Sequence, residues 1–106
     1  MPFQAKVEAQ SSSGIAVADI SGWEPGLKPS QLTIKDVTTG TGTASLFGMA
    51  GGADAFEPLK DANGDAVTVA LSGVSTTITY TLDAIYNHIK VASDASGDSF
   101  TIVVGA

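Results

Sequence analysis

The stretch TITYTL, residues 77–82, alternates threonine with a large apolar residue at every position. Successive side chains of a β-strand point to opposite faces of a sheet, so this alternation predicts a strand with one buried face and one threonine-rich face in water. The preceding segment predicts another strand, because Val67, Val69 and Leu71 share one face. The second half of the chain is therefore expected to form an antiparallel sheet.

Turn-forming residues separate the predicted strands. The strongest turn signal is DANGD, residues 61–65, because Asn-Gly readily adopts the positive φ angles of tight turns. A second turn is predicted at residues 94–98, between strands at residues 85–92 and 100–104. Upstream, alternating or apolar segments lie at residues 3–9, 15–20, 32–35 and 45–47.

Seven or eight short strands at this spacing predict an all-β fold, an antiparallel β-sandwich of the jelly-roll or immunoglobulin-like type. At 106 residues the chain has the usual size of one domain. We therefore expect a single domain over residues 1–106, in which residues 1–14 form an N-terminal strand or arm and its connector. Closely spaced glycines predict a loop over residues 48–55.

Charge and composition argue against several classes of partner. The formal net charge is −6, and the five lysines are scattered without any arginine, whereas nucleic-acid binding requires clustered basic residues. Anionic membrane surfaces are disfavoured for the same reason, and no run of about 18 apolar residues could span a bilayer. The chain has no cysteine, and its start, MPFQ, has no basic stretch followed by an apolar run. We expect no disulfide, no secretory signal and synthesis in a cytoplasm.

The spacing of Asp61, Asn63 and Asp65 matches the start of a calcium-binding loop, and residues 94–98 repeat this spacing of oxygens. The EF-hand pattern also requires glycine at loop position six and glutamate at position twelve, whereas Gly64 is fourth here and a serine is twelfth. We therefore interpret both segments as turns and keep the first three residues only as weak metal candidates. No cofactor is expected.

The sequence contains no recognisable catalytic constellation. His88 is the only histidine, the nucleophile motif Gly-x-Ser-x-Gly is absent, and the carboxylates are dispersed without a close pair typical of glycosidases. GTGTAS, residues 40–45, lacks the third glycine of a dinucleotide-binding loop and the lysine of a phosphate-binding loop. We expect a surface or interface histidine in a protein that is not an enzyme.

Aromatic and apolar residues outside the later strands are candidates for a partner interface. Trp23 lies in a Pro-Gly turn, where it either anchors a partner or closes one end of the core, and the second interpretation is preferred. The interface candidates are Phe3, Val7, Trp23, Phe47 and Met49.

The order of segments in the later part of the chain matches a known pattern of strands and turns. The segments are TASLFG (43–48), a glycine-rich loop, FEPL (56–59), DANGDAVT (61–68), a threonine-rich strand, IYNHIKVASD (85–94) and SFTIVVG (99–105). This order resembles small β-sandwich structural proteins of tailed bacteriophages, of the head-decoration and of the spike or fibre type. The likeness covers about residues 41–106 and includes no active-site motif.

The resemblance implies a non-enzymatic virion protein that is made in the host cytoplasm and located on the head surface. It implies a capsid decoration, or cement, protein that binds the major capsid protein or another virion protein as a symmetric homo-oligomer, with a trimer favoured. The alternative is a receptor- or carbohydrate-binding module of a phage spike, tail or fibre, in which Trp23, Tyr80 or Tyr86 would form a stacking surface.

Overall fold

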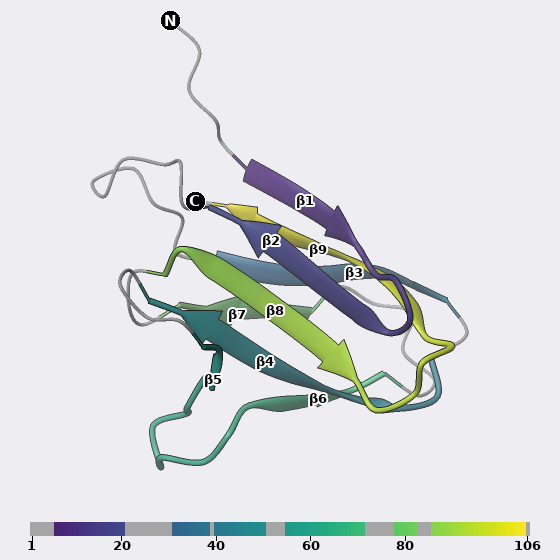
Figure 1. Ribbon diagram of the computed structural model, residues 1–106. Coiled ribbons are helices and arrows are strands. Elements are labelled where there is room, and N and C mark those ends of the chain that lie inside the picture. Colours follow the sequence, from purple (N-terminus) through teal and green to yellow (C-terminus); the bar gives the residue numbers. More distant parts are fainter. Residues whose placement is uncertain are drawn as a thin grey trace, which may run out of the picture.

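The computed structural model describes residues 6–20, 31–38, 40–50, 55–71, 78–82 and 86–105. Within these segments the chain forms nine β-strands and no helix (Figure 1). The strands are β1 (Lys6–Gln10), β2 (Ile15–Asp19), β3 (Gln31–Thr38), β4 (Thr43–Met49), β5 (Glu57–Pro58), β6 (Thr68–Ala70), β7 (Ile78–Thr81), β8 (His88–Ser93) and β9 (Ser99–Gly105).

The strands form two antiparallel sheets that pack face to face. The back sheet has the order β1-β9-β3-β7, and the front sheet has the order β2-β8-β4-β5, with β6 also paired to β4. Every strand pair is antiparallel. The predicted all-β antiparallel sandwich is confirmed, with nine strands in the described residues instead of the seven or eight predicted.

The chain passes from the back sheet to the front sheet through a tight turn between β1 and β2. Ser12 N donates to Ile15 O at 2.8 Å, and Ile15 N donates to Ser12 O at 3.1 Å. Ser13 and Gly14 both have positive φ angles, of 55° and 79°, as a type I′ turn requires. The connector predicted to end at Gly14 is thus a turn that fixes β2 beside β1.

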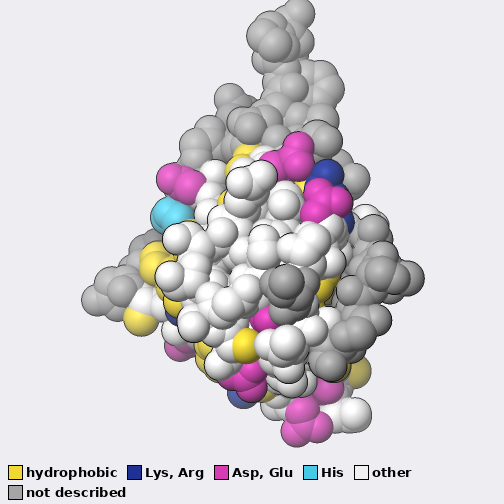
Figure 2. All heavy atoms as spheres, turned by 90° about the vertical axis from the view of Figure 1, so that its right-hand side faces the viewer, with side chains coloured by type: hydrophobic (Ala, Val, Ile, Leu, Met, Phe, Trp, Pro, Cys, Tyr) yellow, Lys and Arg dark blue, Asp and Glu magenta, His cyan; other side chains and the backbone are white. Residues whose placement is uncertain are grey.

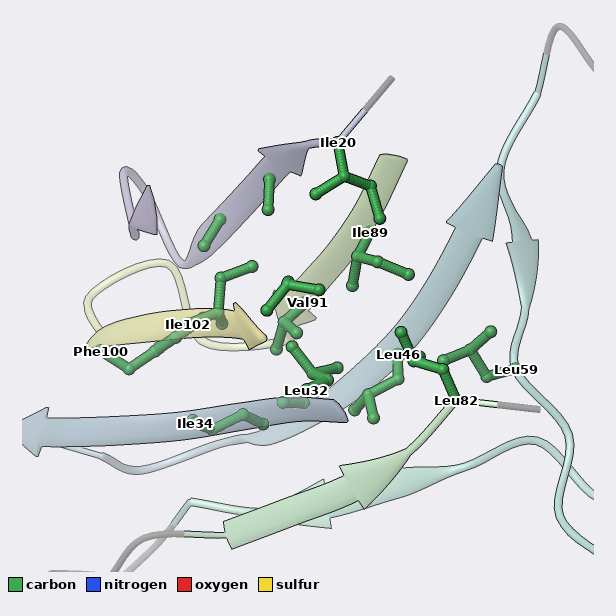
Figure 3. Packing of buried hydrophobic residues seen from close by; sticks show 14 of the residues in the cluster. Ile20, Leu32, Ile34, Leu46, Leu59, Leu82, Ile89, Val91, Phe100 and Ile102 are labelled. Carbon is green, nitrogen blue, oxygen red and sulfur yellow. The ribbon is translucent and has the colours of Figure 1, made fainter. Parts of the chain in front are cut away.

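Inward-facing residues of both sheets form one apolar core, as the alternation along the strands predicts. Leu46 of β4 and Ile89 of β8 meet Leu32 of β3 and Ile102 of β9 between the sheets (Figure 3). Each of these side chains is at most 1% exposed. Full burial of an aliphatic side chain of this size stabilises the fold by about 1.5–3 kcal/mol, so the core supplies the main stabilising term.

β5 and β6 are the two halves of one edge strand beside β4. Leu59 N donates to Leu46 O at 2.9 Å, and Leu46 N donates to Val67 O at 3.3 Å, so both halves meet at a single residue of β4. Residues 60–66 leave the sheet between the two halves, and every one of them is exposed. We call this segment the excursion; in Figure 1 it is the loop between β5 and β6.

The excursion contains the predicted turn at residues 61–65, which is confirmed. Gly64 has a φ angle of 83°, and Gly64 N donates to Asp61 O at 3.0 Å. The Asp61 carboxylate accepts the backbone N–H groups of Asn63 and Asp65 at 2.8 and 3.0 Å. The turn therefore has the local side-chain bonding that Asp, Asn and Gly favour.

The loop predicted to begin at Gly48 begins later, because β4 continues to Met49. Gly48 is buried, and a Cβ atom there would lie 2.5 Å from Cδ1 of Tyr86. The glycine is thus needed for the Tyr86 ring to pack against the strand and does not break it. The segment predicted as a strand from residue 85 is a strand from His88 onward, and residues 51–54 lie outside the described part.

Candidate interaction surface

The outward side of the front sheet brings together residues from four strands. In its central row Val17 of β2 lies opposite Lys90 of β8, Lys90 lies opposite Phe47 of β4, and Phe47 lies opposite Pro58 of β5. We call this surface the front face. It consists of Ile15, Val17, Asp19, Ser45, Phe47, Met49, Phe56, Pro58, His88, Lys90 and Ala92.

β2 contributes the most exposed large apolar side chains of the described residues. Ile15 and Val17 are each 44% exposed, whereas Ala16 and Ala18 are 1% exposed and face the core. In this strand the larger apolar residues therefore point into water and the smaller ones point inward. In Figure 2, hydrophobic side chains lie next to the histidine along the left flank, which is the side of the front sheet.

Lys90 lies between two aromatic rings at the centre of the front face. Its Nζ atom is 4.5 Å from the ring centroid of Phe47 and 4.7 Å from that of Phe56. Both distances fit cation–π interactions, which orient the ammonium group across β4. No ion pair joins Lys90 to a carboxylate in the described part of the chain.

His88 forms the rim of the front face next to Lys90. Its Nε2 atom is 3.5 Å from Oδ1 of Asp19, and the edge of its ring meets Phe56 with the ring centroids 6.4 Å apart. The Nδ1 atom is buried without a hydrogen-bond partner. When the imidazole is protonated, the contact with Asp19 is an ion pair that balances charge on this surface.

The acidic residues considered as metal ligands bond to backbone groups of the chain itself. The carboxylate of Asp61 caps its own turn, and Oδ1 of Asp94 accepts Thr43 N at 2.9 Å. Among the described residues, no group of three or more His, Cys, Asp or Glu is arranged to hold a metal ion. Asn63 and Asp65 contribute backbone N–H groups to the turn, so the structure brings the three candidates together in a turn motif.

Asp98 is a buried carboxylate whose bonds the sequence did not reveal. It is 3% exposed and accepts hydrogen bonds from the Ser93 hydroxyl at 2.6 Å, Thr41 N at 2.8 Å, the Thr41 hydroxyl at 3.0 Å and Gly42 N at 3.0 Å. The bond from Ser93, followed by those from Thr41 and Gly42, holds the pKa of Asp98 below its usual value although burial acts in the opposite direction. This carboxylate ties the end of β8 and the segment before β4 to the start of β9.

The structure places only two of the five predicted interface residues on the front face. Phe47 and Met49 lie there, whereas Val7 is on β1 of the back sheet, half-buried against the core. Phe3 and Trp23 lie outside the described residues.

The remaining front-face residues, above all Ile15, Val17 and Lys90, were not predicted from the sequence. One signal could have found the first two. In IAVAD large and small apolar residues alternate, so one side of β2 must present isoleucine and valine wherever the other side is the core.

Comparison of the chain with protein families, with curated proteins and with solved structures gives no match. The described segments contain no helix that could cross a bilayer. The fold and the front face define a β-sandwich with one apolar outer surface. Its role therefore has to be inferred from the chemistry of that surface.

Proposed function

We propose that this chain is a non-enzymatic structural protein of a tailed-phage virion, most simply a decoration protein of the head surface. The observation that carries the proposal is the front face, where Ile15 and Val17 remain 44% exposed on a rigid strand. Apolar residues at such positions add nothing to the core and are typical of surfaces covered by a protein partner. The virion context comes from the order of segments over residues 41–106.

In this proposal the front face is covered by a neighbouring subunit of the particle. The neighbour is the major capsid protein, another virion protein or a further copy of the chain, and the symmetric homo-oligomer implied by the resemblance, a trimer, is part of the same proposal. The acidic turns keep the free protein soluble before assembly, because the net charge of −6 opposes non-specific association. Covering the front face would then add stability in the particle.

Quantitative mass spectrometry of purified virions tests the proposal. A decoration protein is expected in a copy number comparable to that of the major capsid protein or a simple fraction of it. Absence from the particle, or one or two copies, would contradict the head-decoration role.

The alternative is a receptor- or carbohydrate-binding module, and two of its three candidate aromatic residues already hold contacts within the chain. The hydroxyl of Tyr80 donates to Lys60 O at 3.0 Å, and the Tyr86 ring packs against Gly48. Both side chains are partly buried against the core and hold structural contacts. A stacking surface would therefore depend on Trp23, and a glycan array probed with the wild type and Trp23→Ala tests that alternative.

A further inference from the structure

The front face differs from the rest of the surface in its charge. It carries Lys90, His88 and the Asp19 carboxylate next to that histidine, and the exposed Glu57 of β5 lies at its edge between Phe56 and Pro58. Most other described carboxylates lie away from it: Glu8 and Asp36 on the back sheet, Asp61 and Asp65 in the excursion, and Asp94 in the turn after β8. Among the described residues, most of the acidic side chains therefore lie outside the front face.

Two copies of an acidic protein repel each other wherever their acidic surfaces meet. The front face carries the two exposed large apolar side chains of the described residues, Ile15 and Val17, and few charges, so two copies can approach there at low electrostatic cost. We propose that the front faces of two copies pack against each other about a two-fold axis. This inference rests on the proposed function for a covered front face, names a second copy as the covering subunit, and replaces the trimer of that proposal with a two-fold dimer.

The front face is self-complementary, as a two-fold contact requires. It offers the ammonium group of Lys90, which has no ion pair with a carboxylate in the described part of its own chain. It also offers the Asp19 carboxylate, whose side chain is 65% exposed. In the dimer, Lys90 of each copy faces a carboxylate of the other copy, while Val17 and Phe47 fill the apolar centre.

The size of the front face sets the strength of the dimer. Four strands about 4.8 Å apart, with a rise of about 3.3 Å per residue, give a surface of roughly 20 Å by 20 Å. Two such faces bury a total of roughly 800 Å², which is below the range of standard specific interfaces and typical of weak, transient contacts. The dimer is therefore reversible and concentration-dependent. A two-fold contact closes with two copies, so a trimer would need a different contact.

Sedimentation velocity on the full chain tests the proposal. Between about 5 µM and 500 µM the wild type should shift from monomer towards dimer, as mass action requires for a weak interface. Val17→Lys should raise the Kd at least about tenfold, because it places a charge in the apolar centre. The matched control is Val103→Lys, an outward-facing valine of β9 in the back sheet, which should leave the Kd unchanged.

A second pair of variants separates the local contact from general repulsion. Lys90→Glu and Lys35→Glu change the net charge equally, but Lys35 is on β3 of the back sheet. Only Lys90→Glu should weaken the dimer strongly. Circular dichroism and thermal unfolding verify the fold of each variant, and Ile15→Ser replaces Val17→Lys if the latter does not fold.

Three outcomes would overturn the proposal: a wild type that stays monomeric over the whole range, a trimer, or equal weakening by front and back variants. A monomer present in many copies on virions would remove this inference and leave the proposed function in place. If the protein forms the front-face dimer but is absent from virions, this inference stands and the proposed function is contradicted.

Discussion

The two outer faces of the sandwich follow the same alternation but differ in chemistry. The back face is mainly polar, with Val103 as an outward-facing valine: Thr33 and Thr81 lie on it, and Lys35 Nζ reaches Glu8 Oε1 at 3.3 Å across β9. The front face presents Val17 and other apolar groups instead. A core needs apolar residues on only one side of each sheet, so those of the front face are not explained by folding. This difference is the reason why we propose the front face as the contact surface.

The largest effect is expected from adjacent residues of β4 that point to opposite sides. Leu46→Ala removes a core side chain that is 1% exposed and should lower the free energy of unfolding by about 2–5 kcal/mol. Phe47→Ala, on the front face, should cost about 1 kcal/mol or less in the monomer. Urea unfolding at low protein concentration measures both. Equal losses of stability would mean that Phe47 supports the core, and would contradict the difference between the core-facing and outward sides of the front sheet.

A smaller loss is expected at Asp98, which ties the two sheets together. Its folded pKa is lowered, so the unfolded state binds more protons as the carboxyl group titrates. The stabilisation is fully present above the ordinary pKa of aspartate and is lost as pH falls through the folded value.

The measurement is urea unfolding of the wild type and Asp98→Asn between about pH 7 and pH 2. The wild type should have the larger free energy of unfolding at neutral pH. The difference from Asp98→Asn should decrease steadily below about pH 5. A difference in stability that is constant with pH would show that the charge of the Asp98 carboxylate does not stabilise the connection between the sheets.

The aromatic contacts of Lys90 should contribute less to the free energy of unfolding than the hydrogen bonds of Asp98. A double-mutant cycle with Lys90→Met and Phe47→Leu is expected to give a coupling of about 0.5–1 kcal/mol, because cation–π pairs at partly exposed sites have this strength. Thermal unfolding of the four proteins at monomeric concentration supplies the data. A coupling of zero would mean that the rings do not hold the ammonium group in place. It would then be less suited to face a carboxylate of the second copy.

The smallest effect is expected from the back face. The Lys35–Glu8 pair is partly exposed, so its coupling in a cycle with Lys35→Met and Glu8→Gln should be about 0.2–0.5 kcal/mol. About 1 M NaCl should abolish it, since salt screens exposed charges over a few ångströms. A larger coupling that persists in salt would indicate that the Lys35–Glu8 pair is shielded from solvent, and that the back face could be a contact surface too.

The strands and turns could be predicted because their signals are local. The alternation that covers β7, Ile78–Thr81, and the Asn-Gly pair at residues 63–64 each determine a local conformation within a few residues. The pairing of strands is not local. Nothing between Glu57 and Ala70 indicates that β5 and β6 both pair with β4 and not mainly with each other.

The front face and the hydrogen bonds of the Asp98 carboxylate could not be predicted because they too depend on contacts between distant parts of the chain. Thr41 and Gly42, which donate to Asp98, precede it by 57 and 56 residues, so no sequence window contains the cluster. In β2 the size of Ile15 and Val17 suggests burial, but Ala16 and Ala18 face the core. β2 and β9 lie close together, and the small Ala16 and Ala18 side chains are buried between the sheets.

The excursion has a consequence for how this scaffold can vary. Leu59 and Val67 both bond to Leu46, so the chain leaves the sheet and returns to it at the same place. Lys60 O still accepts the Tyr80 hydroxyl, but beyond this contact the length of the segment can change at little cost, because loop closure costs only about 0.6 kcal/mol for each doubling of loop length. Related chains can carry longer or shorter segments here without altering the core. An engineered epitope grafted between Ala62 and Gly64 would be displayed on the same framework.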